Sequence, residues 1–384
     1  MTSTPAKIRV PFFMHDLGQA ELDAVAEVLR NPILTTGEWV ARFERRFAER
    51  LGARHAVAVT SCTGALHISL VALGVGPGDE VITTPMTFIA TATAIIEAGA
   101  TPVFVDVEPA TGNLDTGRVE EAITERTRAI MPVHLYGQMC DMRQLRVLAD
   151  RHNLVIVEDA AHCVEGSRDG VRPGQLGDTA CFSFYATKNL TCGEGGALVT
   201  NDDALAEKLQ LLRLHGMNKN ANDRHREGYR HWDMTQFGWK YNMDNIQAAL
   251  LLPQLDRLDD NWLRRKDLAE YYQRRLRDIR NLSWPATLPD VVHAWHLFSV
   301  WIGDGHRDRV IQQLQNEGIS VMVNYRAIHL LTYFRETFGF RKGDFPVAES
   351  IGDASLSLPF YPSMPREHAD LVAEELTRAL ERCP

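Results

Sequence analysis

The stretch ACFSFYATKNLTCGEGGA, residues 180–197, is the part of the chain from which the rest is best understood. Its apolar, aromatic run at residues 181–184 is short enough to predict a buried strand. Lys188 follows where the chain must turn out of the sheet, at the edge where open α/β sheets bind ligands. The three glycines after it would let backbone pass close to a bulky group. A lysine there could form an imine, but a single lysine after a strand is more often a surface residue, so its neighbours must decide.

Apolar strands and amphipathic helices alternate along the first two hundred residues. This alternation predicts an α/β fold, in which a mostly parallel sheet is covered by helices on both faces. The predicted strands are residues 55–60, 80–83, 101–105, 129–133, 154–157, 181–184 and 196–200. The predicted helices are residues 16–30, 38–51, 63–73, 88–98, 115–123, 141–152 and 202–214.

The composition changes after these elements. Residues 215–242 are polar and aromatic without a clear period, and they are too many for an ordinary connection, so we predict a functional loop. A long helical stretch over residues 245–276 then leads into a second unit. We predict a large domain at residues 1–249 and a smaller C-terminal α+β domain at residues 250–384. The later elements are predicted at residues 294–302, 307–317 and 366–380.

Size and composition bound the functional classes. With 384 residues, 45% of them hydrophobic and 24% charged, the chain can bury a sizeable core. Its formal net charge of −9 and scattered basic residues argue against a nucleic-acid partner. No run of about 18 apolar residues and no signal-peptide pattern is visible, so we expect a cytoplasmic protein with no membrane partner. Cysteines and histidines are dispersed without metal-ligand spacing, so no metal site is predicted.

Two stretches near Lys188 could hold a phosphate group. Ser61, Thr63 and Gly64 lie between a predicted strand and a predicted helix, where free N–H groups, hydroxyls and a close backbone approach suit an anion. The same residues also suit any ordinary helix start. Ser183 lies in the strand that leads to Lys188 and could add a further hydroxyl.

Two more residues suit a pyridine ring. Asp159 ends a predicted strand and could pair with the ring nitrogen of pyridoxal phosphate (PLP), keeping that nitrogen protonated. Glu158 points to the opposite face if the strand persists, so only one of the two can meet the ring. Phe88 follows another strand and could stack on a flat cofactor. The alternatives are a helix cap for Asp159 and a core position for Phe88.

The chain resembles a known family through several motifs. In their combination and spacing, they are similar to the DegT/DnrJ/EryC1/StrS family of sugar aminotransferases, which are fold type I PLP enzymes. The resemblance runs from about residue 10 to about residue 365. It implies a large PLP-binding domain followed by a smaller α+β domain. The motifs are SCTGAL at 61–66, TPMTFIAT at 84–91, VEDAAH at 157–162, FSFYATKNLTCGEGG at 182–196, RLHG at 213–216, YNMDNIQAAL at 241–250 and HAWHLF at 293–298.

The resemblance implies a role for each matching residue. Lys188 would be the catalytic lysine that forms the Schiff base, and Asp159 would be the partner of the pyridine nitrogen. Phe88 would stack on the ring. His162 falls near the cofactor's 3-hydroxyl, where most members have a glutamine. The phosphate contacts would be Thr63, Gly64 and Ser183.

The resemblance also implies partners. Asn242 matches an asparagine that reaches the phosphate from the neighbouring subunit, which implies a homodimer with shared active sites. Tyr325 and His329, in the segment NYRAIH at 324–329, match a region that lines the sugar-nucleotide pocket, with His329 as the expected substrate contact. Asn324–Tyr325 stands where the usual pair is His-Tyr. From the residues alone, the preferred role of Asn242 would be to cap a helix that begins near Met243 or Asp244.

A transamination cycle follows from these roles. Lys188 would act as imine partner and then as the base that moves a proton, and burial should lower its pKa. The resemblance implies that L-glutamate becomes 2-oxoglutarate and that its amino group passes to a nucleotide-linked keto sugar, with motifs most like those of the 4-keto branch. Two alternatives are a 3-keto sugar aminotransferase and a non-catalytic binding or regulatory protein on the same fold.

Overall fold

A computed structural model describes residues 8–218 and 231–383 of the chain. In these residues, a sheet of seven strands forms the centre of the fold. Every neighbouring pair of these strands is parallel except the two pairs that include β8 (Gly196–Thr200). In spatial order the strands are β1 (His55–Val59), β8, β7 (Thr179–Ser183), β5 (Val155–Asp159), β4 (Thr127–Ile130), β2 (Glu80–Thr83) and β3 (Thr101–Phe104). The predicted α/β fold with a mostly parallel sheet is therefore confirmed.

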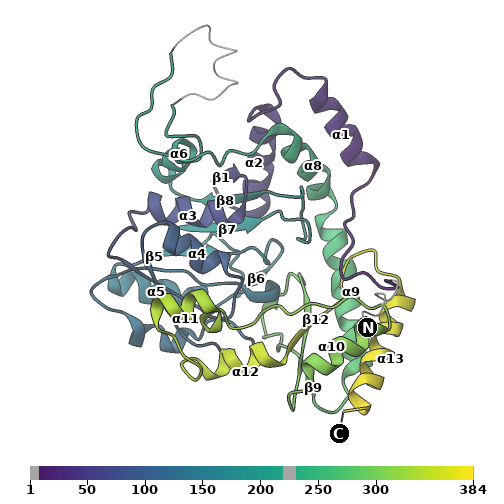
Figure 1. Ribbon diagram of the computed structural model, residues 1–384. Coiled ribbons are helices and arrows are strands. Elements are labelled where there is room, and N and C mark those ends of the chain that lie inside the picture. The colour runs from purple at the N-terminus through teal and green to yellow at the C-terminus, as the bar shows by residue number, and fades with distance from the viewer. Residues whose placement is uncertain (1–7, 219–230, 384) are drawn as a thin grey trace.

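Helices cover both faces of this sheet (Figure 1). On one face, α2 (Glu38–Leu51), α5 (Met142–His152) and α8 (Asn245–Asp256) contribute to one buried apolar cluster. On the other face, α3 (Cys62–Ala72), α4 (Ala90–Glu97) and α6 (Asp203–Leu212) contribute to a second. Because the sheet is covered on both sides, most residues of its strands are buried rather than alternating between buried and exposed.

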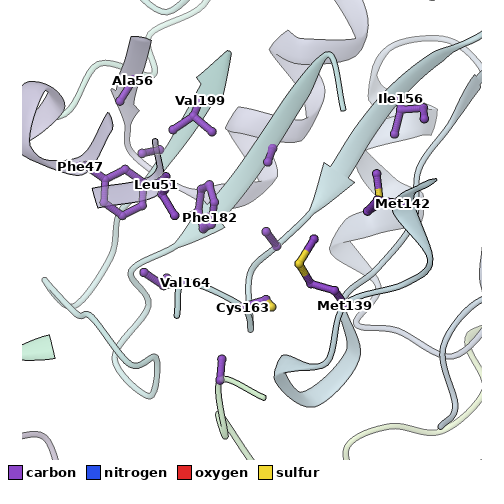
Figure 2. Packing of buried hydrophobic residues seen from close by; sticks show 14 of the residues in the cluster. Phe47, Leu51, Ala56, Met139, Met142, Ile156, Cys163, Val164, Phe182 and Val199 are labelled. Carbon is purple, nitrogen blue, oxygen red and sulfur yellow. The ribbon is translucent and has the colours of Figure 1, made fainter. Parts of the chain in front are cut away.

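The strand that leads to Lys188 is held firmly by aromatic packing. Phe182 lies edge-on against Phe47 of α2 at 5.1 Å between ring centroids, and Figure 2 shows the two rings together. Phe184 lies edge-on against Phe43 at 5.4 Å. The N–H of Phe184 donates to the carbonyl of Gly195, and its own carbonyl accepts from the N–H of Cys192. The residues between Phe184 and Cys192 thus form a loop whose two ends are held together by backbone hydrogen bonds.

The C-terminal part forms its own layer (Figure 1). Its three-stranded antiparallel sheet places β11 (Phe298–Ile302) between β12 (Ser355–Leu358) and β9 (Leu282–Ser283). The long helix α9 (Leu258–Leu276) joins the two parts. Leu258 of α9 packs in the apolar cluster of the large sheet, and Leu268 packs in the apolar cluster of the C-terminal part. The helix therefore passes from one hydrophobic core to the other. Val10 also packs in the C-terminal cluster, and the boundary at residues 249 and 250 stays a prediction.

Some predicted elements differ from the observed ones. Residues 115–123 form two 3₁₀ turns, η1 (Thr116–Arg118) and η2 (Glu120–Ala122), because the Asp115 carboxylate accepts from the N–H of Gly117 and closes a tight turn. The predicted strand at 294–302 begins only at Phe298. The helical stretch at 245–276 is two helices, because Arg257 leaves the helical conformation.

The remaining elements complete the description. Residues 219–230, the middle of the predicted functional loop, lie outside the described residues. None of the helices in the described ranges is both long and apolar enough to cross a membrane. The other helices are α1 (Gln19–Leu29), η3 (Leu135–Gly137), α10 (Arg307–Asn316), η4 (Ile328–Leu330), α11 (Thr332–Phe338), α12 (Pro346–Ala354) and α13 (Arg366–Glu381), and a small two-stranded sheet pairs β6 (Ser167–Arg168) with β10 (Val291–Val292).

Candidate active site

The carboxyl ends of the parallel strands open into a cavity of about 520 Å³. Residues after β1, β2, β5 and β7 all reach it, because parallel strands end at one edge of the sheet. Most of the predicted site residues line it. They are Thr63, Phe88, Asp159, His162, Ser183, Lys188 and Tyr325.

Lys188 lies on the loop after β7, where its N–H donates to the carbonyl of Tyr185 at 2.9 Å. Burial lowers the pKa of its ammonium group to about 8, and the nearby Asp159 carboxylate opposes this shift. A neutral amine is therefore far more accessible near physiological pH than for an exposed lysine, whose pKa is about 10.4. This is the property that an amine nucleophile or base needs.

Asp159 is the last residue of β5, and its carboxylate faces the cavity. The hydroxyl of Thr91 donates to one oxygen at 2.7 Å, and the N–H of Ala161 donates to the other at 3.2 Å. Burial raises the pKa of this carboxyl, while these hydrogen bonds and Lys188 oppose the shift. Glu158 points to the other side, where its carboxylate lies 2.8 Å from Nε2 of His134. Only Asp159 of the two can meet a ring in the cavity.

The start of α3 forms one wall. The hydroxyl oxygen of Ser61 accepts from the N–H of Gly64 at 3.0 Å, and Thr63 lines the cavity. Gly64 does not line the cavity. A larger residue would be crowded at this position, because a Cβ there would lie 3.2 Å from the Tyr241 ring. The phosphate contact of Gly64 stays a prediction, and in this structure its N–H donates to Ser61. Ser183 presents a buried hydroxyl to the same wall.

His162 has a defined hydrogen-bonding state. The N–H of Tyr136 donates to its Nδ1 at 3.2 Å, and the Tyr325 hydroxyl lies 3.1 Å from its Nε2. Burial, with the charge of Lys188, holds the pKa of His162 well below its usual range. The neutral ring must therefore carry its proton on Nε2, because Nδ1 is an acceptor. The ring of Phe88, which is 55% exposed, lies 6.0 Å from that of Tyr325 at the cavity mouth.

The geometry can be compared with known proteins at this point. The family model for the DegT/DnrJ/EryC1/StrS aminotransferase family matches residues 15–377. The chain belongs to this family.

Named relatives agree with this membership. The spore coat polysaccharide biosynthesis protein SpsC of Bacillus subtilis is 43% identical over 371 residues, covering 95% of both chains. GDP-perosamine synthase of Caulobacter vibrioides is 40% identical over 368 residues, covering 94% of this chain and 95% of its own. The crystal structure of DesV from S. venezuelae, in complex with a ketimine intermediate, is 38% identical with a TM-score of 0.91 and covers 98% and 100% of the two chains.

This protein is therefore a PLP-dependent sugar aminotransferase. Similar solved sugar aminotransferases exist in PLP and pyridoxamine phosphate forms. The residues present fit that cofactor: an amine with a lowered pKa and a carboxylate face one cavity, and a helix start with hydroxyls forms its wall. Lys188, Asp159 and Thr63 are the side chains that would hold the carbonyl, ring nitrogen and phosphate ends of PLP.

Asn242 of this aminotransferase lies outside its own chain's cavity. Its amide donates to the Thr36 hydroxyl at 2.7 Å, and the Lys240 ammonium donates to its carbonyl oxygen. The alternative that Asn242 caps a helix is wrong, because Asp244 caps α8 by accepting from the N–H of Gln247. A contact of Asn242 with the partner's phosphate stays a prediction.

His329 has no exposed surface and does not line the cavity. Its Nε2 lies 3.0 Å from a carboxylate oxygen of Glu349, and its ring packs on Phe345 at 4.8 Å. His329 does not line the cavity of its own chain, and its contact with the substrate stays a prediction. Tyr325, from the same motif, does line the cavity.

Two site residues escaped prediction, although both lie in the quoted motifs. Thr91, at the start of α4, positions the Asp159 carboxylate. His296, within HAWHLF, lines the cavity beside His162, with 4.4 Å between ring centroids. The sequence signal was a polar residue in an apolar, helical context for Thr91 and a histidine among aromatic residues for His296.

Proposed function

We propose that this sugar aminotransferase moves the amino group of L-glutamate to a nucleotide-linked keto sugar at C4, which gives an amino-deoxy sugar nucleotide. The observation that carries the proposal is the placement of the Lys188 amine and the Asp159 carboxylate in one cavity that opens between aromatic side chains. The 40% identity to GDP-perosamine synthase supports a nucleotide sugar, and the motif resemblance to the 4-keto branch supports C4.

When bound, PLP supplies the electron sink that lets an amino group leave one carbon and enter another. Lys188 would hold the cofactor through its amine and, when that amine is free, would take and return a proton at its Nζ. The Asp159 carboxylate stabilises a proton on the ring nitrogen, and Thr91 keeps that carboxylate oriented. His162, neutral and protonated on Nε2, is a hydrogen-bond donor beside these groups.

The mouth of the cavity suits a sugar nucleotide. The cavity volume lies within the range of small-molecule sites, about 300–1,000 Å³. Phe88, Tyr185 and Met322 line it and are also exposed, at 55%, 47% and 52%. Apolar and aromatic surface in that position would pack against a nucleotide base that extends from a sugar held inside.

The proposed enzyme is a homodimer in which the partner completes each site. Among the residues that the structure describes, no arginine lines the cavity, although the glutamate carboxylates and the cofactor phosphate all require partners. Asn242 would contribute from the partner subunit.

A substrate panel tests the proposed reaction. The PLP-loaded enzyme is incubated with L-glutamate and UDP-, dTDP- and GDP-linked sugars that carry a keto group at C4 or at C3, and products are identified by mass spectrometry. We expect amination of a 4-keto sugar with release of 2-oxoglutarate. Amination of 3-keto sugars alone would support the 3-keto alternative, and no amination would support a binding role on the same fold.

A further inference from the structure

His296 is a buried polar side chain that has no role in the reaction proposed above. It is 5% exposed, comes from the segment before β11 and lines the cavity together with Lys188. Its Nδ1 lies 3.2 Å from Oδ1 of Asn189, the residue directly after Lys188. Its Nε2 has no hydrogen-bond partner among the described residues. One nitrogen is thus held by the protein and the other is left for a ligand.

Asn189 cannot turn its amide the other way. Its Nδ2 donates to a carboxylate oxygen of Glu165 at 2.9 Å and to the carbonyl of Ala294 at 3.2 Å. Both groups only accept hydrogen bonds, so the amide nitrogen must face them. The amide oxygen then faces His296, and it can only accept. Nδ1 of His296 must therefore carry a proton.

Glu165, which accepts the hydrogen bond from Asn189, is itself held in a buried ion pair. Arg265 of α9 donates to Glu165, and the two side chains are 3% and 2% exposed. Removing either partner of such a pair would leave the other charge buried and unpaired. Glu165 accepts hydrogen bonds from both Arg265 and Asn189, and so keeps the Asn189 amide oriented.

His296 is neutral in this environment. Burial, with the positive charge of Lys188, holds its pKa well below the usual range. A neutral imidazole has one proton, which Asn189 fixes on Nδ1, so Nε2 carries a lone pair. His162, whose ring lies against His296, has the opposite arrangement, with its proton on Nε2. The proton on Nε2 of His162 is directed to the Tyr325 hydroxyl, so of the two rings it is His296 that offers a nitrogen to a ligand.

We propose that Nε2 of His296 accepts a hydrogen bond from a hydroxyl group of the keto sugar, and that Asn189, Glu165 and Arg265 are positioning residues that hold His296 in the required tautomer. The sugar as the ligand of His296 rests on the proposed function, whereas the tautomer of His296 follows from the hydrogen bonds of the protein alone. A sugar that lacks the hydroxyl loses this hydrogen bond, so the site favours the hydroxylated ring.

Neutron diffraction from deuterated crystals of the holoenzyme tests the tautomer directly. We expect deuterium on Nδ1 of His296 and none on Nε2. Deuterium on Nε2 alone would overturn the inference, whatever the substrate. Because this readout needs no sugar, it decides the tautomer independently of the proposed function.

Kinetics test the contact with a GDP-linked 4-keto sugar as the probe. His296→Phe keeps a ring against His162 but loses the acceptor, so KM for the sugar should rise about tenfold, the effect of one lost hydrogen bond. Asn189→Leu, which frees the tautomer, should raise KM in the same direction. The half-reaction with L-glutamate, followed by absorbance, measures how far each variant disturbs the cavity itself, and KM for the sugar should change by a larger factor than the rate of that half-reaction.

The matched control is His293→Phe. His293 is also buried and lies in the same segment, but it does not line the cavity, and its Nδ1 accepts from the N–H of Trp295. Its KM for the sugar should equal that of the wild type. A His296→Phe enzyme with unchanged KM would overturn the sugar contact. A wild-type enzyme that aminates no sugar would instead overturn the proposed function, and with it the sugar as the donor.

Discussion

At the scale of single residues, the chemistry depends on the balance between Lys188 and Asp159. Burial disfavours charge on both groups, and each charge stabilises the other. The result is an amine that is partly neutral near pH 8 beside a carboxylate that hydrogen bonds from Thr91 and Ala161 keep oriented. Both residues could be proposed from the sequence, because Asp159 ends an apolar strand and Lys188 lies on the turn that follows one. His296 and Thr91 could not, because their position depends on how distant segments pack.

The first prediction concerns the pH dependence of cofactor capture. Imine formation needs the neutral amine, so the rate at which the cofactor-free enzyme captures added PLP should rise as pH increases through about 8 and then level off. A lysine with an ordinary pKa would give a rate that continues to rise toward about pH 10.4. Stopped-flow absorbance measures the rate. Lys188→Arg is the control, and capture at an unchanged rate in that variant would contradict the assignment.

The second prediction concerns Asp159→Asn. The neutral amide cannot stabilise a proton on the ring nitrogen, and a nearby opposite charge moves a pKa by about one to three units. Both half-reactions should therefore slow by about tenfold to a thousandfold, while KM for L-glutamate changes little. Single-turnover absorbance separates the two half-reactions. Unchanged rates would remove Asp159 from the site.

At the scale of elements, the site depends on how closely β8 passes the start of α3. Gly196, the first residue of β8, lies against the backbone of Ser61 and Cys62, where an added Cβ would be 2.4 Å from the nearest atom. The sequence predicted that the glycines after Lys188 let backbone pass close to a bulky group, and Gly196 does make a close approach, to backbone. It could not show that the group approached is the helix start that forms the cavity wall.

The third prediction follows from this contact. Gly196→Ala should lower the free energy of unfolding by about 1–3 kcal/mol, as overpacking usually does, because backbone atoms cannot move aside as a side chain can. It should also weaken PLP binding by displacing α3. Thermal or denaturant unfolding and a PLP titration measure the two effects. Gly76→Ala is the control, because its Cβ would have only an ordinary contact at 3.9 Å; equal behaviour of both variants would contradict the account.

At the scale of the whole molecule, strand alternation correctly predicted the sheet, because apolar strands between helices have few other ways to be buried. The C-terminal residues were harder to place. His329 and Tyr325 are four residues apart in one motif, yet one is buried against Glu349 and the other lines the cavity. The sequence pattern does not distinguish the two residues, because the segment is irregular and has no helical or strand period. Which of its side chains is buried depends on how the segment packs against the rest of the protein.

The fourth prediction concerns assembly. If Asn242 acts across the subunit interface, mixing inactive Lys188→Ala with an inactive variant that has a bulky residue at position 242 should restore activity, because each heterodimer contains one intact site. Subunit exchange is verified by native mass spectrometry. If exchange occurs and activity does not return, the shared site is excluded.

The central claim is that Lys188 is the residue through which this enzyme binds and uses its cofactor, and chemical trapping tests it most directly. The purified PLP enzyme is reduced with borohydride, digested and mapped by mass spectrometry. We predict a pyridoxyl group on Lys188, lost from that peptide when the enzyme is first incubated with L-glutamate. A pyridoxyl group on another lysine would contradict the account.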